Sequence, residues 1–561
     1  MGRRGRSCGG RVPGDAVVDT SGSGTDVLVV GAGPVGLTAA CELRRRGVRC
    51  RLVERLPARL PYAKAVGVQP RTLELWDRMG LVRDALDLAV PLRGQLTYVN
   101  GVADSRLELV LPPEVPYGFA ALPQYETERV LEGLLNGFGT GIERSTELVS
   151  FAQDGEGVTC LLRAPGGEEE VRARFLVGCD GAHSTVRKGL GLSFEGGAFP
   201  EEYMLADVEL GWDLPYGYAV RAMHHDARGE VDDVLVCIPL PGAGRYRVSM
   251  KVAPELAGDE DGDEDGDGIE HGLGAGGGRE PGLADVQAVL DRLSPQPTTA
   301  SALRWSSVFR ISHRLVDRYG DGRVLIAGDA AHIHPPTGAQ GMNTGIQDAW
   351  NLAWKLALAV DGAAAPGLLA SYDAERRPVG EEVVGRTVRH AAHGVQADPG
   401  DPRTLMLREA QLLVGYRGSP LVEDAGDGPG PRGGDRAPDC GGLTRAVATY
   451  PLRLFDLLRG REHVLVLYGP GPTADGFGPL AAAVRDAAPG RITTFAVLAD
   501  TGADGASPVP VFRDGQGEFG RLYGVREPTA FLVRPDGYLA ARLAPPSAPE
   551  LLAHLAKVLA P

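Results

Sequence analysis

Apolar runs near the start of the chain alternate with a helical pattern. Residues 26–30 form a short β-rich apolar run, and a second such run covers residues 48–53. Between them lies a pattern of helical period that ends at Gly47, with apolar side chains at Leu37, Ala40, Cys41 and Leu43. Short apolar runs predict buried strands and a period near 3.6 predicts a helix, so this part of the chain predicts a βαβ unit.

The turn inside this unit carries a glycine motif, Gly31-Ala-Gly33-Pro34-Val35-Gly36. An acid, Glu54, follows 18 residues after the last glycine, at the end of the second predicted strand. Glycines at these positions allow a tight turn and a close approach of the backbone to a pyrophosphate, and the acid can bind ribose hydroxyls. The unit predicts dinucleotide binding but does not separate FAD from NAD.

Two further strands end in the same way. Residues 175–177 lead into Asp180-Gly181, where Ser184 can cap a helix that carries Arg187. Residues 324–327 break at Gly328-Asp329, and a loop with Pro335, Pro336, Gly338 and Gly341 follows. Asn343 or Thr344 is the predicted N-cap of the next long helix. A strand-end acid, bare glycine backbone and a helix N-terminus suit a cofactor with a sugar-like chain and an electron-rich head.

Other segments give a coarser picture. Helical patterns cover 70–80, 124–135 and 368–390, and paired strands are expected at 147–164 and 170–177. Residues 195–255 predict a separate, mostly antiparallel sheet, with runs at 205–210, 234–240 and 245–252. Its aromatic side chains could line an apolar pocket, although each one alone is more often a core residue: Tyr203, Trp212, Tyr216 and Tyr218.

The pattern changes after residue 435. Strands are predicted at 464–468 and 493–498, and a helix near 519–523. A hairpin is expected over 528–538 with Asp536-Gly537 at its turn, followed by a last helix from Glu550. The C-terminal 125 residues therefore predict a separate αβ module.

Composition narrows the class of protein. The chain has 561 residues, 43% hydrophobic, with a net charge of −15, which argues against a nucleic-acid partner. No apolar run reaches membrane-spanning length, so no membrane association is expected. Seven cysteines without CxxC or zinc spacing favour reduced thiols and a cytoplasmic location. His332 and His334 have no third ligand in sequence reach, so no metal is expected.

Two segments are expected to be disordered. Residues 1–25 are polar and lack the apolar stretch of a signal peptide. Residues 258–280 form an acidic, glycine-rich insert in which positions 259–270 alone hold eight carboxylates. Its opening matches a calcium-binding EF-hand loop, but the twelfth position is Gly272 where that loop needs a glutamate.

The three strand-end motifs resemble the signature regions of the class A flavoprotein monooxygenases. These regions are GAGPVG (31–36), GCDGAHSTVRKGLG (178–191) and GDAAHIHPPTGAQGMNTGIQDAWNLAWKLA (328–357). The similarity covers residues 26–395 and extends to the phenol hydroxylase and aromatic polyketide hydroxylase branches. The C-terminal module is similar to the thioredoxin-like domain of those branches. It has no CxxC, since Cys440 is its only cysteine, and Pro528 stands where that fold has a cis-proline.

The resemblance implies a division of the chain into domains. Residues 26–95, 125–194 and 320–398 would form a Rossmann-like FAD-binding domain, and 96–124 with 195–319 an inserted, mostly antiparallel substrate domain. Residues 399–435 would be a linker, and 436–561 the thioredoxin-like domain without CxxC.

The resemblance also implies roles for particular residues. Gly31, Gly33 and Gly36, with Pro34 and Val35, would bind the pyrophosphate of FAD, and Glu54 beside Arg55 the adenosine ribose. Gln124 would bind the ribityl-phosphate region, Leu148 would touch the adenine, and Asp329 after Gly328 would hold the ribityl hydroxyls. Asp180 and Arg187 would face the pyrophosphate and the approach of the nicotinamide. The loop around the isoalloxazine ring would comprise Pro335, Pro336, Gly338, Gly341, Met342 and Asn343. Two cations, Lys64 and Arg71, are further candidates for contacts with the flavin chain or the phosphates.

The resemblance implies an NAD(P)H- and O2-consuming monooxygenase that hydroxylates a phenolic or polycyclic aromatic through a C4a-hydroperoxyflavin. No catalytic side chain is assigned, because the chemistry takes place on the flavin. Three alternatives stay open: Baeyer–Villiger oxygenation of a polycyclic ketone, a flavin-dependent dehydrogenase or reductase that does not use O2, and a non-catalytic flavin-binding scaffold. A flavin halogenase is disfavoured because the chain lacks a W-x-W-x-I-P motif. The sequence identifies neither the substrate nor the preferred nicotinamide cofactor, and it leaves a homodimer open.

Overall fold

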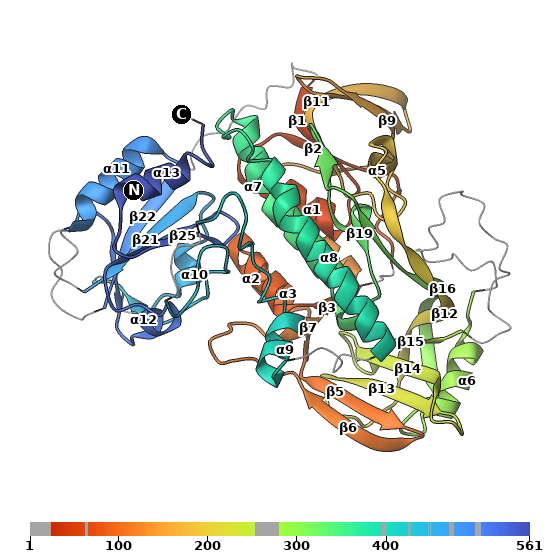
Figure 1. The fold of residues 1–561 in the computed structure, drawn as a ribbon. Helices are drawn as coiled ribbons and strands as arrows, with labels where there is room; N and C mark the ends of the chain where they lie inside the picture. Colours follow the sequence, from red (N-terminus) through yellow and green to blue (C-terminus); the bar gives the residue numbers. More distant parts are fainter. Residues whose placement is uncertain are drawn as a thin grey trace, which may run out of the picture.

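A computed structural model describes residues 24–61, 65–252, 280–393, 400–423, 428–446, 448, 450–470, 476–499 and 507–560. The predicted leader, up to residue 23, lies outside the described residues, as do Lys64 and the acidic insert up to residue 279. The described chain has a mixed α/β fold, with a C-terminal unit beside a larger body (Figure 1). No helix in this described part is long and apolar enough to cross a membrane.

The first sheet of the larger body has the strand order β17-β18-β11-β1-β2-β8. Its parallel strands are β1 (Gly24–Val30), β2 (Cys50–Glu54), β8 (Ile142–Arg144), β11 (Gly167–Gly178) and β18 (Val324–Ile326). β17 (Gly320–Asp321), β9 (Glu147–Gln153) and β10 (Val158–Ala164) pair antiparallel. The paired strands expected at 147–164 and 170–177 are confirmed by the pairing of β10 with β11. The first of them is divided into β9 and β10, because Asp154 accepts hydrogen bonds from the Glu156 and Gly157 N–H groups in a turn.

Helices cover the first sheet because its strands are apolar on both faces. Val27, Leu28 and Val29 of β1 have no exposed surface. The principal covering helices are α1 (Pro34–Arg45), α4 (Gln124–Gly137), α7 (Gly341–Val360) and α8 (Ala370–His393). The predicted βαβ unit is confirmed as β1-α1-β2.

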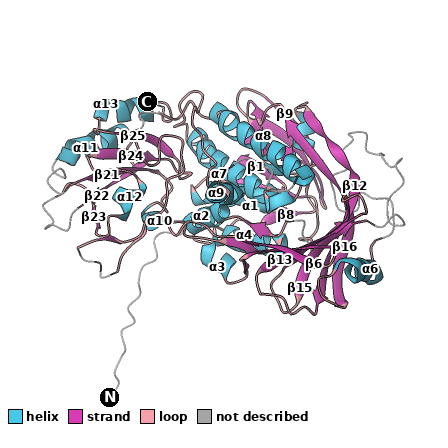
Figure 2. Ribbon diagram, turned by 60° about the horizontal axis from the view of Figure 1, so that its bottom comes forward, coloured by secondary structure: helices cyan, strands magenta, loops and turns pink. Residues whose placement is uncertain are grey.

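The second sheet has the order β19-β16-β12-β15-β14-β13-β5-β6. Its longest strands, β12 (Phe194–Leu210) and β16 (Ala300–Val316), pair antiparallel over most of their length. The other strands are β5 (Gly94–Val99), β6 (Val102–Glu108), β13 (Tyr218–His225), β14 (Val231–Pro239), β15 (Arg245–Lys251) and β19 (His332–Ile333). Helix α6 (Leu283–Leu293) packs on the outer face of this sheet, away from the helices of the first (Figure 2).

A small sheet lies between the two large ones, in the order β3-β7-β4. Its strands are β3 (Gly67–Val68), β4 (Val90–Leu92) and β7 (Phe119–Ala121). Helices α2 (Pro70–Met79) and α3 (Val82–Leu86) connect β3 to β4. The expected end of α2 is confirmed, since Gly80 adopts a positive φ of 81° directly after the helix.

The C-terminal unit is built on a six-stranded sheet, β20-β23-β22-β21-β24-β25. Its strands are β20 (Leu443–Thr444), β21 (His463–Gly469), β22 (Ile492–Leu498), β23 (Val511–Asp514), β24 (Thr529–Val533) and β25 (Leu539–Leu543). Its helices are α10 (Leu454–Leu457), α11 (Phe477–Ala487), α12 (Glu518–Leu522) and α13 (Ala548–Leu555). The hairpin turn at Asp536-Gly537 is confirmed. The cis peptide of the described residues is Ala544–Pro545, so the expectation for Pro528 is wrong.

That hairpin turn joins the two units through a buried polar network. Asp536 accepts hydrogen bonds from the indole N–H groups of Trp350 and Trp354 on α7, each at 3.1 Å. The Glu375 carboxylate on α8 accepts hydrogen bonds from both Nη atoms of Arg534, at 2.6 and 2.8 Å, and from Lys355 Nζ at 2.7 Å. These side chains are all buried, and their contacts hold the C-terminal unit against helices α7 and α8 of the larger body.

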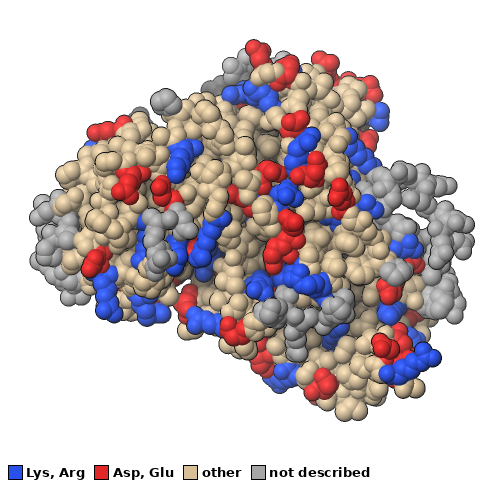
Figure 3. Space-filling view, viewed as in Figure 1, with Lys and Arg blue, Asp and Glu red and all other residues tan. Residues whose placement is uncertain are grey.

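The face drawn in Figure 3 carries acidic and basic side chains interspersed with one another. No large field of one sign covers it.

Candidate functional site

Four parallel strands of the first sheet end at one level. In the register of the sheet, Val30 of β1 pairs with Val53 of β2 on one side and with Gly178 of β11 on the other, and Gly178 pairs with Ile326 of β18. The chain leaves this edge at the glycine motif, at Glu54, at Asp180 and at Asp329. In open α/β sheets, ligands bind outside the carboxyl ends of the strands where the order reverses, which is here beside β1.

The glycine motif has the geometry of an anion cradle. Gly31 has φ of 95°, and a Cβ on it would lie 2.3 Å from the Cys179 carbonyl oxygen. A Cβ on Gly36 would meet the Gly31 oxygen at 1.9 Å, whereas a Cβ on Gly33 would meet nothing within 4 Å. Among the described residues, the N–H groups of Gly33, Val35 and Gly36 have no acceptor. Backbone N–H groups at the start of a helix, next to open space, favour a phosphate.

Glu54 organises the same loop. Its Oε2 accepts a hydrogen bond from the Ala32 N–H at 2.8 Å and its Oε1 from the Leu56 N–H at 3.0 Å. The carboxylate therefore lies directly beside the glycine motif, at the place expected for a ribose contact. The neighbouring Arg55 side chain is exposed.

Asp180 and Arg187 hold the second motif together. Asp180 accepts hydrogen bonds from Ser184 Oγ at 2.6 Å and from the Val186 N–H at 3.1 Å, and burial raises its pKa. Ser184 caps helix α5 (Thr185–Gly189) by accepting from the Arg187 N–H, as predicted. The Arg187 guanidinium is buried, lies 4.0 Å from the Phe194 ring centroid and donates to the Ala330 carbonyl oxygen at 3.4 Å. Arg187 thus links the second motif to the backbone beside Asp329.

Asp329 differs from the other two strand-end acids. It is half-buried in a short 3-10 turn, Gly328–Ala330, and no hydrogen-bond donor to its carboxylate is present in the described part of the chain. The turn is fixed by Asp348 instead, which accepts from the Gly328 N–H at 3.1 Å, from His332 Nε2 at 2.8 Å and from Arg376 Nε at 2.7 Å. Burial opposes the charge, but Arg376 and His332 outweigh it and lower the pKa of Asp348.

The loop that follows Asp329 ends in the N-terminus of α7. The predicted N-cap at Asn343 or Thr344 is wrong: the helix begins at Gly341, with Gln340 at the cap position. The Asn343 side chain is instead a buried tie. It donates to the Gly67 and Ala339 carbonyl oxygens at 2.9 and 2.8 Å, and it accepts from the Gln69 N–H and Thr72 Oγ1. The N–H groups of Gly341, Met342 and Asn343 have no acceptor among the described residues, so the helix end is available to an electron-rich group.

Residues of the expected linker support this loop from behind. Gln411 Nε2 donates to Gln340 Oε1 at 2.7 Å and to Thr344 Oγ1 at 3.0 Å, and Gln340 Nε2 donates to Glu409 Oε2 at 3.2 Å. Arg386 of α8 pairs in turn with Glu409. The segment therefore carries a helix, α9 (Pro402–Glu409), and packs against the loop. These residues could not be predicted from the sequence because each is an ordinary polar side chain outside any motif.

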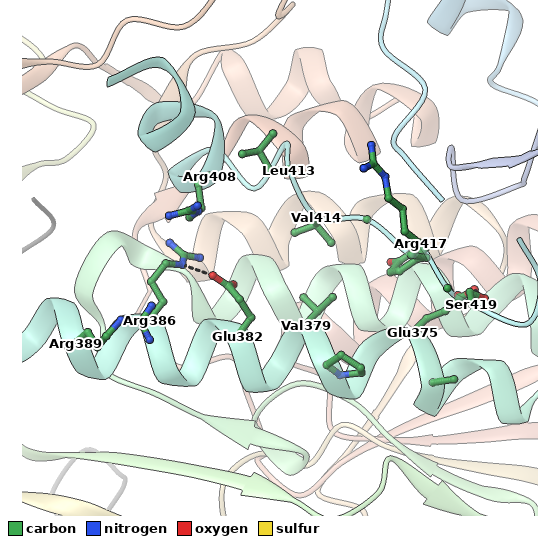
Figure 4. Close-up of a pocket in the computed structure, with 15 residues that line it drawn as sticks. Glu375, Val379, Glu382, Arg386, Arg389, Arg408, Leu413, Val414, Arg417 and Ser419 are labelled. Atoms are coloured by element: carbon green, nitrogen blue, oxygen red, sulfur yellow. Dashed lines mark hydrogen bonds and ion pairs between the residues drawn. The ribbon is translucent and has the colours of Figure 1, made fainter. Parts of the chain in front are cut away.

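A cavity of about 650 Å³ lies behind this support, between α8 and residues 408–419 (Figure 4). Arg386 and Arg408 approach one another across it, and Arg386 pairs with Glu382 at 3.0 Å on the same helix. Since Arg386 also pairs with Glu409, which accepts from Gln340, the cavity lies behind the loop that precedes α7.

The remaining predicted contacts divide into three groups. Gln124 lies at the start of α4, where its Nε2 donates to Glu128 at 2.9 Å, and Leu148 is buried in β9. Lys64 is outside the described residues. The prediction that Arg71 contacts the flavin chain or the phosphates is wrong. Its guanidinium is buried, pairs with Glu74 at 2.9 Å and lies 4.9 Å from the Tyr538 ring centroid. Arg71 therefore contacts the C-terminal unit, because its helix turns that side away from the strand ends.

One face of the second sheet lies next to the loop that precedes α7. Residues that pair across a sheet share one face, and the face on α6 holds Met204, Val220 and Leu235 in its core. The opposite face, called here the substrate wall, includes Tyr203, Leu205, Arg221, Val236, Ile238 and Phe309, and beside Ile238 it carries the buried ion pair of Arg247 with Asp207. Ile238 packs with Val66 and Leu92, next to Gly67. A Cβ on Gly67 would lie 2.4 Å from Ala339 of the loop, so the wall and the loop are neighbours.

Of the aromatic residues expected at a pocket, the structure puts only Tyr203 on this wall. Trp212 donates to Ser294 Oγ at 3.0 Å beside α6, Tyr216 is exposed, and Tyr218 accepts a hydrogen bond from Arg106 and donates to Glu108. The wall carries two arginines, of which Arg247 is paired with Asp207 and Arg221 is not paired within the described residues. The Nε of Arg221 is buried without an acceptor, no hydrogen bond of its side chain is present in the described chain, and burial lowers its pKa.

The histidines of the loop are not arranged as metal ligands. Burial and the nearby His332 lower the pKa of His334 to about 3, so His334 is neutral. Within the described residues, no group of three or more His, Cys, Asp or Glu side chains could hold a metal ion.

The residues present fit FAD. The open space at Gly33 and the unused N–H groups at the start of α1 suit a pyrophosphate, the Asp329 carboxylate without a donor suits the hydroxyls of a ribityl chain, and the unused N–H groups at the start of α7 suit an electron-rich flavin head. A single nicotinamide nucleotide would leave the long loop before α7 without a ligand.

Comparison with known proteins agrees with this geometry. A family model described as an FAD binding domain matches residues 24–265 and 275–387. An anhydrotetracycline monooxygenase of Streptomyces rimosus is 34% identical over 548 residues, covering 93% of this chain and 95% of that protein. A pentachlorophenol 4-monooxygenase of Sphingobium chlorophenolicum is 30% identical, covering 92% and 93%. The crystal structure of an aklavinone-11 hydroxylase in a ternary complex with FAD and aklavinone superimposes with a TM-score of 0.74 at 27% identity, covering 95% of this chain and 98% of that one. The chain therefore belongs to the family defined by this FAD binding domain and is an FAD-dependent monooxygenase.

Proposed function

We propose that the protein hydroxylates a phenolic or polycyclic aromatic substrate of polyketide type, with O2 as the oxygen source and NAD(P)H as the reductant. The relatives named for anhydrotetracycline and pentachlorophenol, and the neighbour that holds aklavinone, support this substrate class. The observation that carries the proposal is the substrate wall, which presents apolar and aromatic side chains beside Arg221, whose side chain has no hydrogen bond within the described residues.

The unused donors and acceptors at the strand ends support the following residue roles at the cofactor. Backbone N–H groups of Gly33, Val35 and Gly36 bind the pyrophosphate, Glu54 the adenosine ribose and Asp329 the ribityl hydroxyls. The N-terminus of α7 directs partial positive charge at the electron-rich edge of the flavin head. When bound, FAD supplies electron transfer from NAD(P)H and the activation of O2.

The chain's own side chains position the substrate. A ring carrying an ionised hydroxyl would lie along Tyr203 and Phe309 with its oxygen at Arg221, which has donors to spare. Such an ion pair favours the phenolate, whose ring is more electron-rich than that of the phenol. The apolar residues Leu205, Val236 and Ile238 exclude water from the same chamber.

We also infer that residues 26–393 combine a Rossmann-like FAD-binding domain with an inserted, mostly antiparallel substrate domain. The C-terminal unit is thioredoxin-like in architecture and structural in role. Its strand order, with three parallel strands flanked by an antiparallel hairpin, supports this fold. Burial raises the pKa of Cys440, the only cysteine of the unit, so it is an unreactive thiol.

The test is substrate-dependent turnover of the FAD-loaded protein. NAD(P)H oxidation and O2 uptake are measured with a panel of hydroxyaromatics and their methyl ethers. We expect the free phenols to stimulate both rates, and Arg221→Leu to raise KM for them by roughly 10–100-fold, the cost of one hydrogen bond to a charged group. The methyl ethers should not respond to this substitution, and Arg228→Leu, in an exposed turn, is the matched control. Equal effects of Arg221→Leu on phenols and ethers would contradict the assignment.

A further inference from the structure

The cavity between α8 and residues 408–419 has the size of a small-molecule site. Its volume is about 650 Å³, and ligand pockets commonly measure roughly 300–1,000 Å³. Within the described part of the chain, no residue of the substrate wall and none of the loop from Pro335 to Gln340 lines it. The cavity is therefore separate from the substrate chamber and from the expected position of the flavin.

The middle of the cavity is apolar. Pro378 and Val379 line it from α8, and Leu413 and Val414 line it from the opposite segment (Figure 4). The Leu413 side chain is 50% exposed although it belongs to this apolar lining. An apolar ring that covered these side chains would remove their surface from water, which favours binding.

One end of the cavity is cationic. Arg386 of α8 and Arg408 of α9 approach one another there (Figure 4). The Arg386 side chain is only 2% exposed, and it uses its Nε for Glu382, at 3.0 Å, and its Nη1 for Glu409. Its Nη2 has no hydrogen bond within the described residues and is not sealed from solvent. A largely buried guanidinium therefore presents an unused donor at the cavity that it lines.

The acidic side chains of the lining are already bonded. Glu375 and Glu382 both accept hydrogen bonds from basic side chains. Arg417, at the other end of the cavity, pairs with Asp435 at 2.7 Å. These contacts leave the end with Arg386 as the place for an added anion. The charged residues of the lining are four arginines and two glutamates: Arg386, Arg389, Arg408, Arg417, Glu375 and Glu382.

We propose that this cavity binds a small aromatic carboxylate, with its ring against Val379, Leu413 and Val414 and its carboxylate at Arg386 Nη2. Guanidinium donors match carboxylate oxygens in geometry, and such charge-assisted hydrogen bonds are stronger than neutral ones. Because Arg386 also pairs with Glu409, the bound carboxylate would lie one ion pair away from the loop that precedes α7. The site does not depend on which substrate the chamber accepts.

The test is calorimetric titration of the full-length, FAD-loaded protein with 2-naphthoate. The background is Arg221→Leu, which removes the cation of the substrate chamber, so that binding at the cavity is measured apart from the chamber. We expect binding to persist there, and Leu413→Asp to weaken it by about 10-fold or more, because an apolar contact is replaced by a like charge. Arg386→Lys keeps a cation near Glu409 but loses the free Nη2, and it should weaken binding by about 10-fold.

Two controls accompany this titration. Leu86→Asp, at a leucine that is 42% exposed on α3, should bind 2-naphthoate like the Arg221→Leu background. The uncharged naphthalene-2-carboxamide should bind about 10-fold more weakly than the carboxylate, because it lacks the charge-assisted hydrogen bond. Loss of all binding in Arg221→Leu would overturn the proposal, since 2-naphthoate would then bind only in the chamber. Binding that Leu413→Asp and Arg386→Lys leave unchanged would overturn it as well.

Discussion

Two glycines of one loop should respond oppositely to alanine in stability, yet alike in FAD binding. Gly33 has φ of −70° and open space around its Cβ position, so Gly33→Ala should leave the apoprotein unchanged or up to about 1 kcal/mol more stable. Gly31 has φ of 95° and no room, so Gly31→Ala should destabilise the apoprotein by about 2 kcal/mol or more. The space beside Gly33 is where the pyrophosphate must approach the backbone. A methyl group there would remove one or two charge-assisted hydrogen bonds, about 3 kcal/mol, or on the order of 100-fold in Kd.

The assay combines apoprotein denaturation in urea with titration of FAD by flavin fluorescence. Gly141→Ala is a matched control, since its Cβ position is also open and its φ is not in the left-handed region. It should bind FAD like the wild type. A Gly33→Ala variant that folds and binds FAD with unchanged affinity would refute the assignment of this loop to the pyrophosphate.

Three more predictions concern single side chains. Asp329→Ala should lose FAD while the apoprotein stays folded. FAD content is measured by flavin absorbance after gel filtration, with the variant Asp321→Ala, at an exposed position, as the control. Full FAD content in Asp329→Ala would contradict the role of Asp329 at the ribityl chain. Gln411→Leu should lower apoprotein stability by about 1–3 kcal/mol and weaken FAD binding, because Gln340 and Thr344 lose a buried partner; a change in stability alone would show that the support does not reach the loop. Arg534 and Lys355 hold the pKa of Glu375 well below its usual range although burial acts in the opposite direction. The stability that the ionised Glu375 carboxylate provides is complete above pH about 4.5 and is lost as pH falls further. Glu375→Gln should therefore cost about 3–5 kcal/mol at pH 7 and flatten the acid limb of a Tm–pH profile. An unchanged acid limb would refute the stabilising role of the contacts of Glu375 with Arg534 and Lys355.

The edge of the first sheet that would bind the cofactor could be predicted from the sequence, because each motif that forms it is a short continuous segment. Each of the three motifs is a strand, a turn and a helix start within about 20 residues, and parallel strands bring their ends to one edge of a sheet. Glu54 and Asp329 therefore lie where expected. Ser184 could be assigned as a cap because capping depends only on the next three residues.

Residues that act across long sequence separations could not be predicted. Gln411 meets Gln340 across 71 residues, and neither belongs to a periodic pattern. Arg71 lies at a helix start that resembles a phosphate site, but its partner Tyr538 is in the last domain. The residue type of Asn343 predicts an N-cap of α7, but its side chain instead forms hydrogen bonds that connect α7 to the start of α2.

The second sheet shows the limit of periodicity. β16 carries Ser306 and Ser307 between apolar residues and lacks a clean alternation of buried and exposed positions. β12 was predicted over its last six residues only, since its first part is interrupted by glycines and Pro200. The identity of the substrate wall, including Arg221, emerged only from the strand register.

Ring hydroxylation requires the transfer of one oxygen atom from O2 to an aromatic ring at this site. The direct measurement is mass spectrometry of the product formed by the FAD-loaded protein from a hydroxyaromatic substrate and NAD(P)H under ¹⁸O2. We expect a product heavier by one ¹⁸O atom, carried as a new ring hydroxyl, with NAD(P)H consumed in proportion. A product without ¹⁸O would contradict monooxygenation, and ¹⁸O inserted beside a ketone as an ester would contradict ring hydroxylation.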